Sequence, residues 1–391
     1  MKPFLYIGLL LIVLTTSGCW DRKEINDLAF ISGTSFDLTD DGKYILSHQI
    51  PIPSTAQAGL GGGGGQELFF VTSATGRNAS DAFQKLQKKT SRTLFTSHRS
   101  LVYIGESLAK HGIEDILDVY THDPRQRLKT YIIVVKGGEG RELLQIKYPF
   151  EQVPSEAVKE MEALGSGLSV TLRDFFLAAS SKGISPVLGV IERDVSSEAG
   201  KENKSKLFKL GGSAIFKDFK LVGFLNENET NGFRWVTDRM KYGVIHASLP
   251  KGDGTLGMIL VNANRKITPE ISGDKIKFKI QVQGEGSLWE NNSPLDVSMP
   301  ENLRLVRKAF EKSIRKQVLD ALSKVQKQYK VDSVGFGQEI YRDKPKQWKA
   351  LEEQWDHKFP DVDVSVEVKL NVRGTGMAGA PLQLKEKEIK E

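Results

Sequence analysis

The first twenty residues constrain this chain more than any other stretch of it. Residues 4–14 form an apolar run of eleven residues, with Lys2 before it. As a helix, this run would span about 16 Å, whereas crossing a bilayer takes roughly 20 apolar residues. The run is therefore better suited to export than to permanent insertion. If the chain stays at a membrane, something else must hold it there.

Small residues and a single cysteine follow the apolar run. Thr16, Ser17 and Gly18 stand directly before Cys19, which is the only cysteine among the 391 residues. Small side chains let a signal peptidase reach the extended backbone, and a thiol can carry a thioether-linked diacylglycerol. This is the layout of a bacterial lipoprotein signal peptide, and it predicts cleavage before Cys19 and lipidation of its sulfur. A transmembrane helix, or a secreted protein with an incidental cysteine, is the alternative.

The composition of the remaining chain is that of a globular protein. Residues 19–391 are enough for two or three domains rather than one core. The sequence is 39% hydrophobic and 27% charged. With Cys19 committed to lipid, no thiol remains for a disulfide or a Cys-ligated metal site. No later apolar run approaches membrane-spanning length, so we expect a globular body that is tethered rather than embedded.

Strand and helix patterns alternate along the first half of the chain. Alternation of apolar and polar residues predicts strands at 28–31 and 44–50, and Asn78 is a plausible N-cap for a helix over 79–89. The stretch 95–112 predicts a strand that runs through a glycine into a helix. This order predicts an α+β (mixed α/β) fold, with two or three α/β domains built from mixed sheets and packed helices.

Changes in this pattern divide the chain into segments. Residues 195–206 are polar and poor in apolar side chains, which is typical of a linker. We therefore expect a signal peptide at 1–18, an N-terminal α/β domain at 19–194, a linker at 195–206, a middle domain at 207–270 and a C-terminal α/β domain at 271–391.

The C-terminal segment contains the best-defined helix pattern, over residues 303–329. Its apolar residues recur at three- and four-residue steps on one face, and the helix would be about 40 Å long. Residues 301–329 also carry a surplus of five positive charges. This surplus could contact an anionic membrane, or it could be a solvated helix face.

Two blocks of the sequence resemble a known family. The first is Gly18-Cys19-Trp20-Asp21, with Glu24-Ile25 close behind it, and the second runs from His98-Arg99 to Gly105-Glu106-Ser107-Leu108-Ala109. Together they resemble the Ger(x)C family, the lipoprotein C subunits of bacterial spore germinant receptors. That family often has a second arginine where this chain has Ser100, so the resemblance does not imply a paired-arginine charge here.

The resemblance covers essentially the whole mature chain. It implies a lipid-anchored, non-enzymatic subunit of a nutrient germinant receptor, on the outer face of the bacterial cytoplasmic membrane, which is the spore inner membrane. It implies integral-membrane A- and B-type receptor subunits as partners, and contact with membrane lipid through Cys19. On the same basis, His98, Arg99, Gly105 and Glu106 are candidate partner-interface or family-signature residues.

A lipid-anchored solute-binding protein of a membrane importer is the alternative function. Such a protein would have two similar lobes around a deep cleft. The sequence contains no internal repeat of lobe size, and the portions on either side of residue 200 are dissimilar. This disfavours the alternative without excluding it.

No catalytic, cofactor or metal site is predicted. Gly374–Gly379 matches the dinucleotide fingerprint, but only twelve residues follow it, too few for the helix and acidic residue that the fingerprint needs. The glycine run 61–65 lacks the following Gly-Lys-Ser/Thr of a phosphate-binding loop. The six histidines are scattered without ligand spacing. No stripe of basic and aromatic residues indicates nucleic-acid binding, and we expect none.

Overall fold

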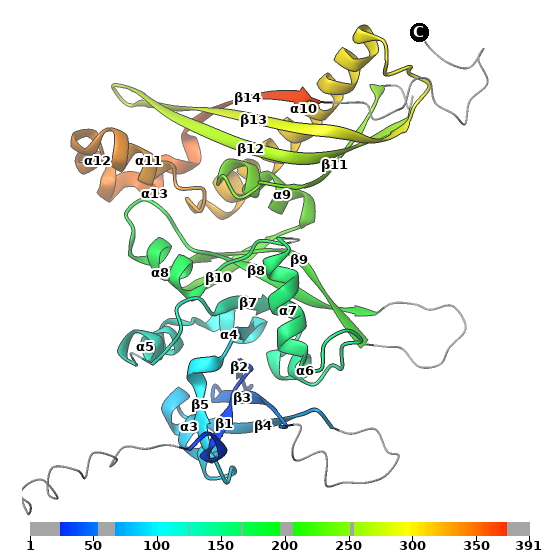
Figure 1. The fold of residues 1–391 in the computed structure, drawn as a ribbon. Coiled ribbons are helices and arrows are strands. Elements are labelled where there is room, and N and C mark those ends of the chain that lie inside the picture. Colours follow the sequence, from blue (N-terminus) through cyan, green and yellow to red (C-terminus); the bar gives the residue numbers. More distant parts are fainter. Residues whose placement is uncertain are drawn as a thin grey trace, which may run out of the picture.

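The computed structural model describes residues 24–53, 67–123, 125–165, 167–195, 206–250 and 254–373. The predicted signal peptide, Cys19, the glycine run 61–65 and the segment Gly374–Gly379 lie outside these residues. The described chain is an elongated body in which two sheets follow one another along the long axis, with the N-terminal strands at one end and the C-terminal sheet at the other (Figure 1). Its mixed sheets and packed helices confirm the predicted α+β fold.

An eight-stranded sheet forms the N-terminal half, in the order β10-β9-β8-β7-β6-β2-β3-β4. Its central strands β2, β6, β7 and β8 are parallel, and the outer ones pair antiparallel. The strands are β2 (Gly33–Leu38), β3 (Tyr44–Pro51), β4 (Phe69–Gly76), β6 (Leu101–Gly105), β7 (Tyr131–Val135), β8 (Val187–Val195), β9 (Lys206–Lys217) and β10 (Lys220–Leu225). A short turn of 3-10 helix, η1 (Ile25–Asp27), leads into β1 (Leu28–Phe30), which pairs with β5 (Thr93–Phe95) in a separate parallel pair.

Helices cover both faces of this sheet, and the alternation of side chains along β6 explains why. Val102 and Ile104 join one cluster of buried apolar side chains, whereas Leu101 and Tyr103 join another on the opposite face. The first face is covered by α3 (Ala79–Gln87), α4 (Glu106–His111), α5 (Glu114–His122) and α8 (Leu172–Ser180). The second is covered by α6 (Gly140–Leu144) and α7 (Pro154–Ala163).

A four-stranded sheet forms the C-terminal half, in the order β11-β12-β13-β14. The elements are β11 (Gly243–Ser248), β12 (Thr255–Ser272), β13 (Lys275–Asn292), α10 (Pro300–Leu322), α11 (Phe336–Asp343), α12 (Pro345–Leu351), α13 (Trp355–Lys358) and β14 (Asp363–Val372). The long helix α10 packs against β11 and β14 and continues as a π-helical turn, η4 (Ser323–Tyr329). Helix and turn together cover the span 303–329 that the apolar pattern predicted as one helix.

The sheets do not follow the segments 207–270 and 271–391 that the sequence analysis separated. Strands β9 and β10 belong to the eight-stranded sheet, and the β12–β13 hairpin runs continuously across the boundary between residues 270 and 271. Whether the predicted domains fold independently is not tested by the sheet topology, and the domain division stays a prediction.

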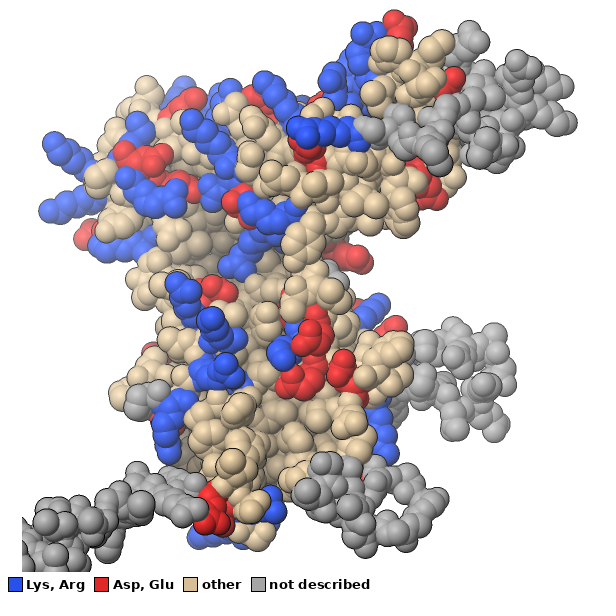
Figure 2. Space-filling view, in the orientation of Figure 1, with Lys and Arg blue, Asp and Glu red and all other residues tan. Residues whose placement is uncertain are grey.

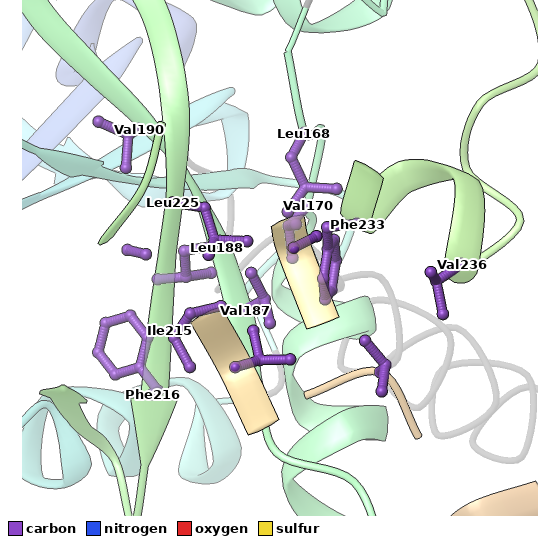
Figure 3. Close-up of a cluster of buried hydrophobic side chains, with 14 of the residues drawn as sticks. Leu168, Val170, Val187, Leu188, Val190, Ile215, Phe216, Leu225, Phe233 and Val236 are labelled. Atoms are coloured by element: carbon purple, nitrogen blue, oxygen red, sulfur yellow. The ribbon is translucent and has the colours of Figure 1, made fainter. Parts of the chain in front are cut away.

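One cluster of buried apolar side chains extends from the eight-stranded sheet into the C-terminal half. Figure 3 shows part of this cluster, in which Val170 lies beside Phe233 of α9 (Glu227–Val236), with Leu168 and Val187 of β8 close by. The same cluster reaches Phe278 in β13 and Phe310 in α10. The two sheets therefore share one core rather than meeting at a polar interface.

Asp332 fixes the backbone where the two halves meet. Its buried carboxylate accepts hydrogen bonds from the amides of Gly335, Phe336 and Gly337, at 2.8 to 3.1 Å, and from the indole of Trp355 at 2.9 Å. Its own carbonyl accepts the amide of Ser185, on the segment before β8, at 2.7 Å. Burial raises the pKa of Asp332 to about 6, and these hydrogen bonds oppose the rise.

Glu162 at the end of α7 makes stability depend on pH. Burial raises the pKa of this carboxyl from 4.5 to about 7, and the charge of Arg234 lowers it by less. Because the folded state then binds the proton more tightly than the unfolded state, this group's contribution is largest below pH 4.5 and is lost as the pH rises to 7. The full difference is about 3 kcal/mol.

Glu162→Gln is expected to remove this dependence. Relative to the parent, the variant should gain about 1–3 kcal/mol in its free energy of unfolding at pH 8 and little at pH 4.5, because the neutral amide resembles the protonated carboxyl. Denaturant unfolding at both pH values measures the difference. Glu160→Gln, an exposed neighbour on the same helix, is the control and should leave the pH profile unchanged. A gain of equal size at both pH values would contradict this role of the carboxyl.

Candidate partner-binding surface

The predicted lipidation signal lies outside the described residues, which begin at Glu24. The structure therefore says nothing about Thr16, Ser17, Gly18 or Cys19, and their role stays a prediction. The residue block that carried the second half of the resemblance is fully described. It occupies the 3-10 turn η2 (Thr96–His98), the central strand β6 and the start of α4.

Arg99 of this block lies inside the protein, with 5% of its surface exposed. Its guanidinium donates hydrogen bonds to Thr34 Oγ1 at 3.1 Å and to Gln126 Oε1 at 2.5 Å. It also lies over the ring of Tyr120 in α5, 4.8 Å from the ring centroid. Arg99 thereby connects β2 to both α5 and the segment that follows it, and its side chain belongs to the interior rather than to an exposed interface.

His48 completes this buried network. Its Nδ1 lies 3.0 Å from Thr34 Oγ1, which also accepts the hydrogen bond from Arg99. Burial and then the charge of Arg99 lower the pKa of His48 to about 3. The imidazole is therefore neutral near neutral pH, and the guanidinium is the only charge in this cluster.

The neighbours of Arg99 in the sequence face different surroundings. His98 is exposed, and its ring packs edge-on against Phe30 with centroids 5.4 Å apart. The hydroxyl of Ser100, where the family often has a second arginine, donates to Glu156 Oε1 at 2.9 Å and to the carbonyl of Ser32 at 3.0 Å. Among these three consecutive residues, His98 is the one that a partner could contact.

Gly105 and Glu106 shape the turn between β6 and α4. A side chain at position 105 would meet the buried carboxylate of Asp37, which accepts the amides of Gly140 and Arg141 at 2.7 and 3.1 Å. Burial raises the pKa of Asp37 to about 6. Glu106 accepts the amide of Gly137 at 2.7 Å. Both signature residues thus secure the connection from β6 to α4 and the loop after β7.

A large groove lies against α5, the helix that also carries Tyr120 of the buried arginine network. It has a volume of about 1200 Å³ and runs between α5 and α8, which lie on the same side of the molecule (Figure 1). Its floor and walls are mainly apolar, and Leu177 of α8 is 54% exposed there. The apolar lining residues are Leu117, Val119, Leu128, Phe176, Leu177 and Phe219.

Acidic side chains line the α5 side of this groove. Glu114, Asp115 and Asp118 stand on its lining, and Arg173 of α8 is the one basic residue among the lining residues. Asp115 accepts a hydrogen bond from the hydroxyl of Tyr44 at 2.9 Å. An apolar groove with an acidic rim fits an amphipathic segment that carries basic residues. Sequence reasoning missed this groove because its lining comes from separate segments between residues 78 and 219.

The described residues suggest neither a metal centre nor a membrane span. None of their helices combines the length and hydropathy that crossing a bilayer requires. Within the same ranges, no three His, Asp or Glu side chains gather in a way that would hold a metal ion.

Comparison with known proteins identifies relatives over nearly the whole chain. The family model described as the spore germination protein N-terminal domain matches residues 21–193, and the one described as spore germination B3/GerAC like, C-terminal, matches residues 211–376. In Bacillus subtilis (strain 168), a putative spore germination protein, YfkR, is 31% identical over 91% of this chain and 92% of its own length. Spore germination protein KC of the same organism is 29% identical over 98% of each chain.

A solved structure has the same fold. The crystal structure of the GerBC protein matches 90% of this chain and 99% of its own, with a TM-score of 0.57 and 20% identity. The two family models and the two relatives cover both the signature block and the C-terminal sheet. The chain therefore belongs to the Ger(x)C family of spore germination proteins, with its characteristic N-terminal and GerAC-like C-terminal domains.

Proposed function

We propose that this chain is a lipid-anchored, non-enzymatic subunit of a nutrient germinant receptor. In this role, it helps the receptor to trigger spore germination. The observation that carries the proposal is the match to spore germination proteins along more than nine tenths of both chains. A match that extends from end to end indicates a shared role of the whole protein, not of one reused domain. The lone cysteine after a short apolar run supports the anchor.

The proposed partners are the integral-membrane A- and B-type subunits of the receptor, at the outer face of the spore inner membrane. The groove between α5 and α8 is the best candidate surface for them, because it combines an exposed apolar lining with an acidic rim. His98 and Glu106 do not line this groove, and in this proposal they could add contacts outside it. In this proposal, the buried Arg99 network serves the interface indirectly by fixing α5 against the sheet.

Leu177→Asp tests the groove as the partner surface. The leucine is 54% exposed, so the change should leave the free energy of unfolding within about 0.5 kcal/mol and yet place a charge in the apolar groove. We expect crosslinked co-purification of the membrane subunits from spore membranes, and germination in response to nutrient, to fall several-fold. Leu305→Asp, on the exposed face of α10, is the matched control. Equal recovery of partners with both variants would rule the groove out.

The solute-binding alternative has less support. It predicts two similar lobes, whereas the described halves contain sheets of eight and four strands with different topologies. A thermal-shift screen against amino acids and sugars separates the two functions. Strong, saturable stabilisation by one of them would favour the solute-binding protein over the receptor subunit.

A further inference from the structure

The described chain begins at one end of the long axis, and this end carries a second apolar groove. The groove has a volume of about 390 Å³ and lies where η1, β1, the ends of β3 and β4 and the turn before β5 meet. Figure 1 places these elements at the opposite end of the molecule from the four-stranded sheet. The apolar lining includes Ile25, Phe30, Ile50, Pro51, Ile52 and Phe70.

Two large side chains of this groove are open to solvent. Ile25 is 74% exposed and Phe70 is 39% exposed. The ionisable residues that line the groove, Lys89 and Arg92, are both basic, and both are exposed. Asp27 of η1 and Glu24, directly before η1, are acidic but do not line it. Exposed aliphatic and aromatic side chains beside lysine and arginine match the chemistry of a bilayer surface with anionic headgroups.

The length of chain before Glu24 limits how far this end can stand from a membrane. Five residue steps separate Cys19 from Glu24, and a fully extended chain covers at most about 18 Å over that distance. A lipidated Cys19 would hold its sulfur at the headgroup level. The groove beside Ile25 would then lie within a short reach of the bilayer, whereas the basic helix α10 lies at the far end of the molecule (Figures 1 and 2).

We propose that the end formed by η1, the β3–β4 ends and the turn before β5 rests on the membrane, with Ile25 and Phe70 entering the lipid interface and Lys89 and Arg92 facing anionic headgroups. This inference rests on the proposed lipid anchor and goes beyond it, since an anchor alone would leave the body free to turn. The occupant of the groove is the lipid surface. The contact sets the orientation of the body, so that the groove between α5 and α8 faces sideways along the membrane.

Single introduced cysteines test this orientation in the mature, full-length chain. The chain has one cysteine of its own, so an acylated protein offers no other thiol to a label. Ile25→Cys and Phe70→Cys place a fluorophore at the proposed contact, and Val261→Cys, at a site 63% exposed in the far sheet, is the matched control. Each labelled protein is reconstituted in vesicles of phosphatidylcholine and phosphatidylglycerol that contain a lipid-borne quencher.

We expect quenching at positions 25 and 70 to exceed that at position 261 several-fold. Equal quenching at all three sites of an acylated chain would overturn the orientation and leave the anchor intact. A parent chain whose own cysteine takes the label is not acylated, and the anchor and the orientation would then fail together. If the fluorescence at position 25 changes with the density of protein on the vesicle and not with the content of lipid quencher, the groove binds a second copy of the chain. That result would overturn the inference.

The charge contribution has a separate test. Lys89→Glu combined with Arg92→Glu is expected to lower quenching at position 25 in vesicles containing phosphatidylglycerol, and to change it little in pure phosphatidylcholine. Lys308→Glu combined with Lys312→Glu, on the distal helix α10, is the control and should have no effect. The same loss of quenching with both pairs would show that net charge rather than this surface is responsible, and would contradict the proposed contact.

Discussion

Cys19→Ala is expected to release the chain from the spore membrane fraction and to abolish or sharply lower germination in response to nutrient. The diacylglycerol would supply most of the membrane affinity, since each buried methylene contributes about 0.8 kcal/mol. The apolar run at residues 4–14 is about half the length of a stable span and should not replace it. Membrane fractionation with immunoblotting, together with a germination assay, measures both effects.

Ser17→Ala is the matched control for this experiment. Alanine keeps the residue small next to the predicted cleavage site, and Cys19 stays in place, so acylation and retention should be unchanged. Mass spectrometry of the N-terminal peptide reports the acyl group directly. Full retention of the Cys19→Ala chain in washed membranes would remove the basis for the anchored subunit.

Arg99→Ala is expected to lower the free energy of unfolding by about 3 kcal/mol. The change leaves the buried oxygen of Thr34 and the partly buried oxygen of Gln126 without this donor and opens a cavity over the ring of Tyr120. Arg99→Lys should recover only part of the loss, because an ammonium group cannot make both hydrogen bonds and stack on the ring. Denaturant unfolding measures all three proteins.

The matched control is Arg125→Ala, close to Gln126 in the sequence. Arg125 pairs with Asp123 on the surface, and its side chain is largely exposed, so its loss should cost less than about 1 kcal/mol. Because Arg99 holds α5 through Tyr120, the Arg99 variant should also weaken partner recovery more than its stability alone explains. If Arg99→Ala lowered the free energy of unfolding by no more than Arg125→Ala, a structural role for the buried guanidinium would be contradicted.

The elements that were predictable from the sequence are those whose pattern is local. The helix over 303–329 follows from its apolar period, and the side chain of Asn78 caps α3 by accepting a hydrogen bond from the amide of Asp81. The strand β6 leading into α4 was equally visible. In each case, residues within a few positions of one another determine the structure.

Strand β2 was missed because its buried side chains are polar and several of their hydrogen-bond partners lie far along the chain. Thr34, Ser35 and Asp37 are polar and fully buried, which breaks the usual apolar signal of a strand. Asp37 is satisfied by the amides of residues 140 and 141, and Thr34 by the guanidinium of Arg99. No local pattern indicates hydrogen bonds between residues 65 to 104 positions apart.

The candidate site was predictable only in part. The signature block was identified from the sequence, but its arginine faces inward. The burial of a charged side chain cannot be predicted when the residues that bind it lie elsewhere in the sequence. The short helices α11 to α13 escaped for a related reason, because the buried carboxylate of Asp332 organises their start and holds Trp355. The end proposed to rest on the membrane was not recognised either, since Ile25, Phe70 and Arg92 come together only in the fold.

The shared apolar cluster has a mechanical consequence. Bending the body between its two sheets would pull Val187 away from Phe233 and expose both to water, at a cost of roughly 25 cal/mol for each Å² of apolar surface. The N-terminal end and the distal sheet should therefore tilt together as one rigid body. A partner that pushes on the far sheet would rotate the whole molecule about the proposed lipid attachment instead of opening it.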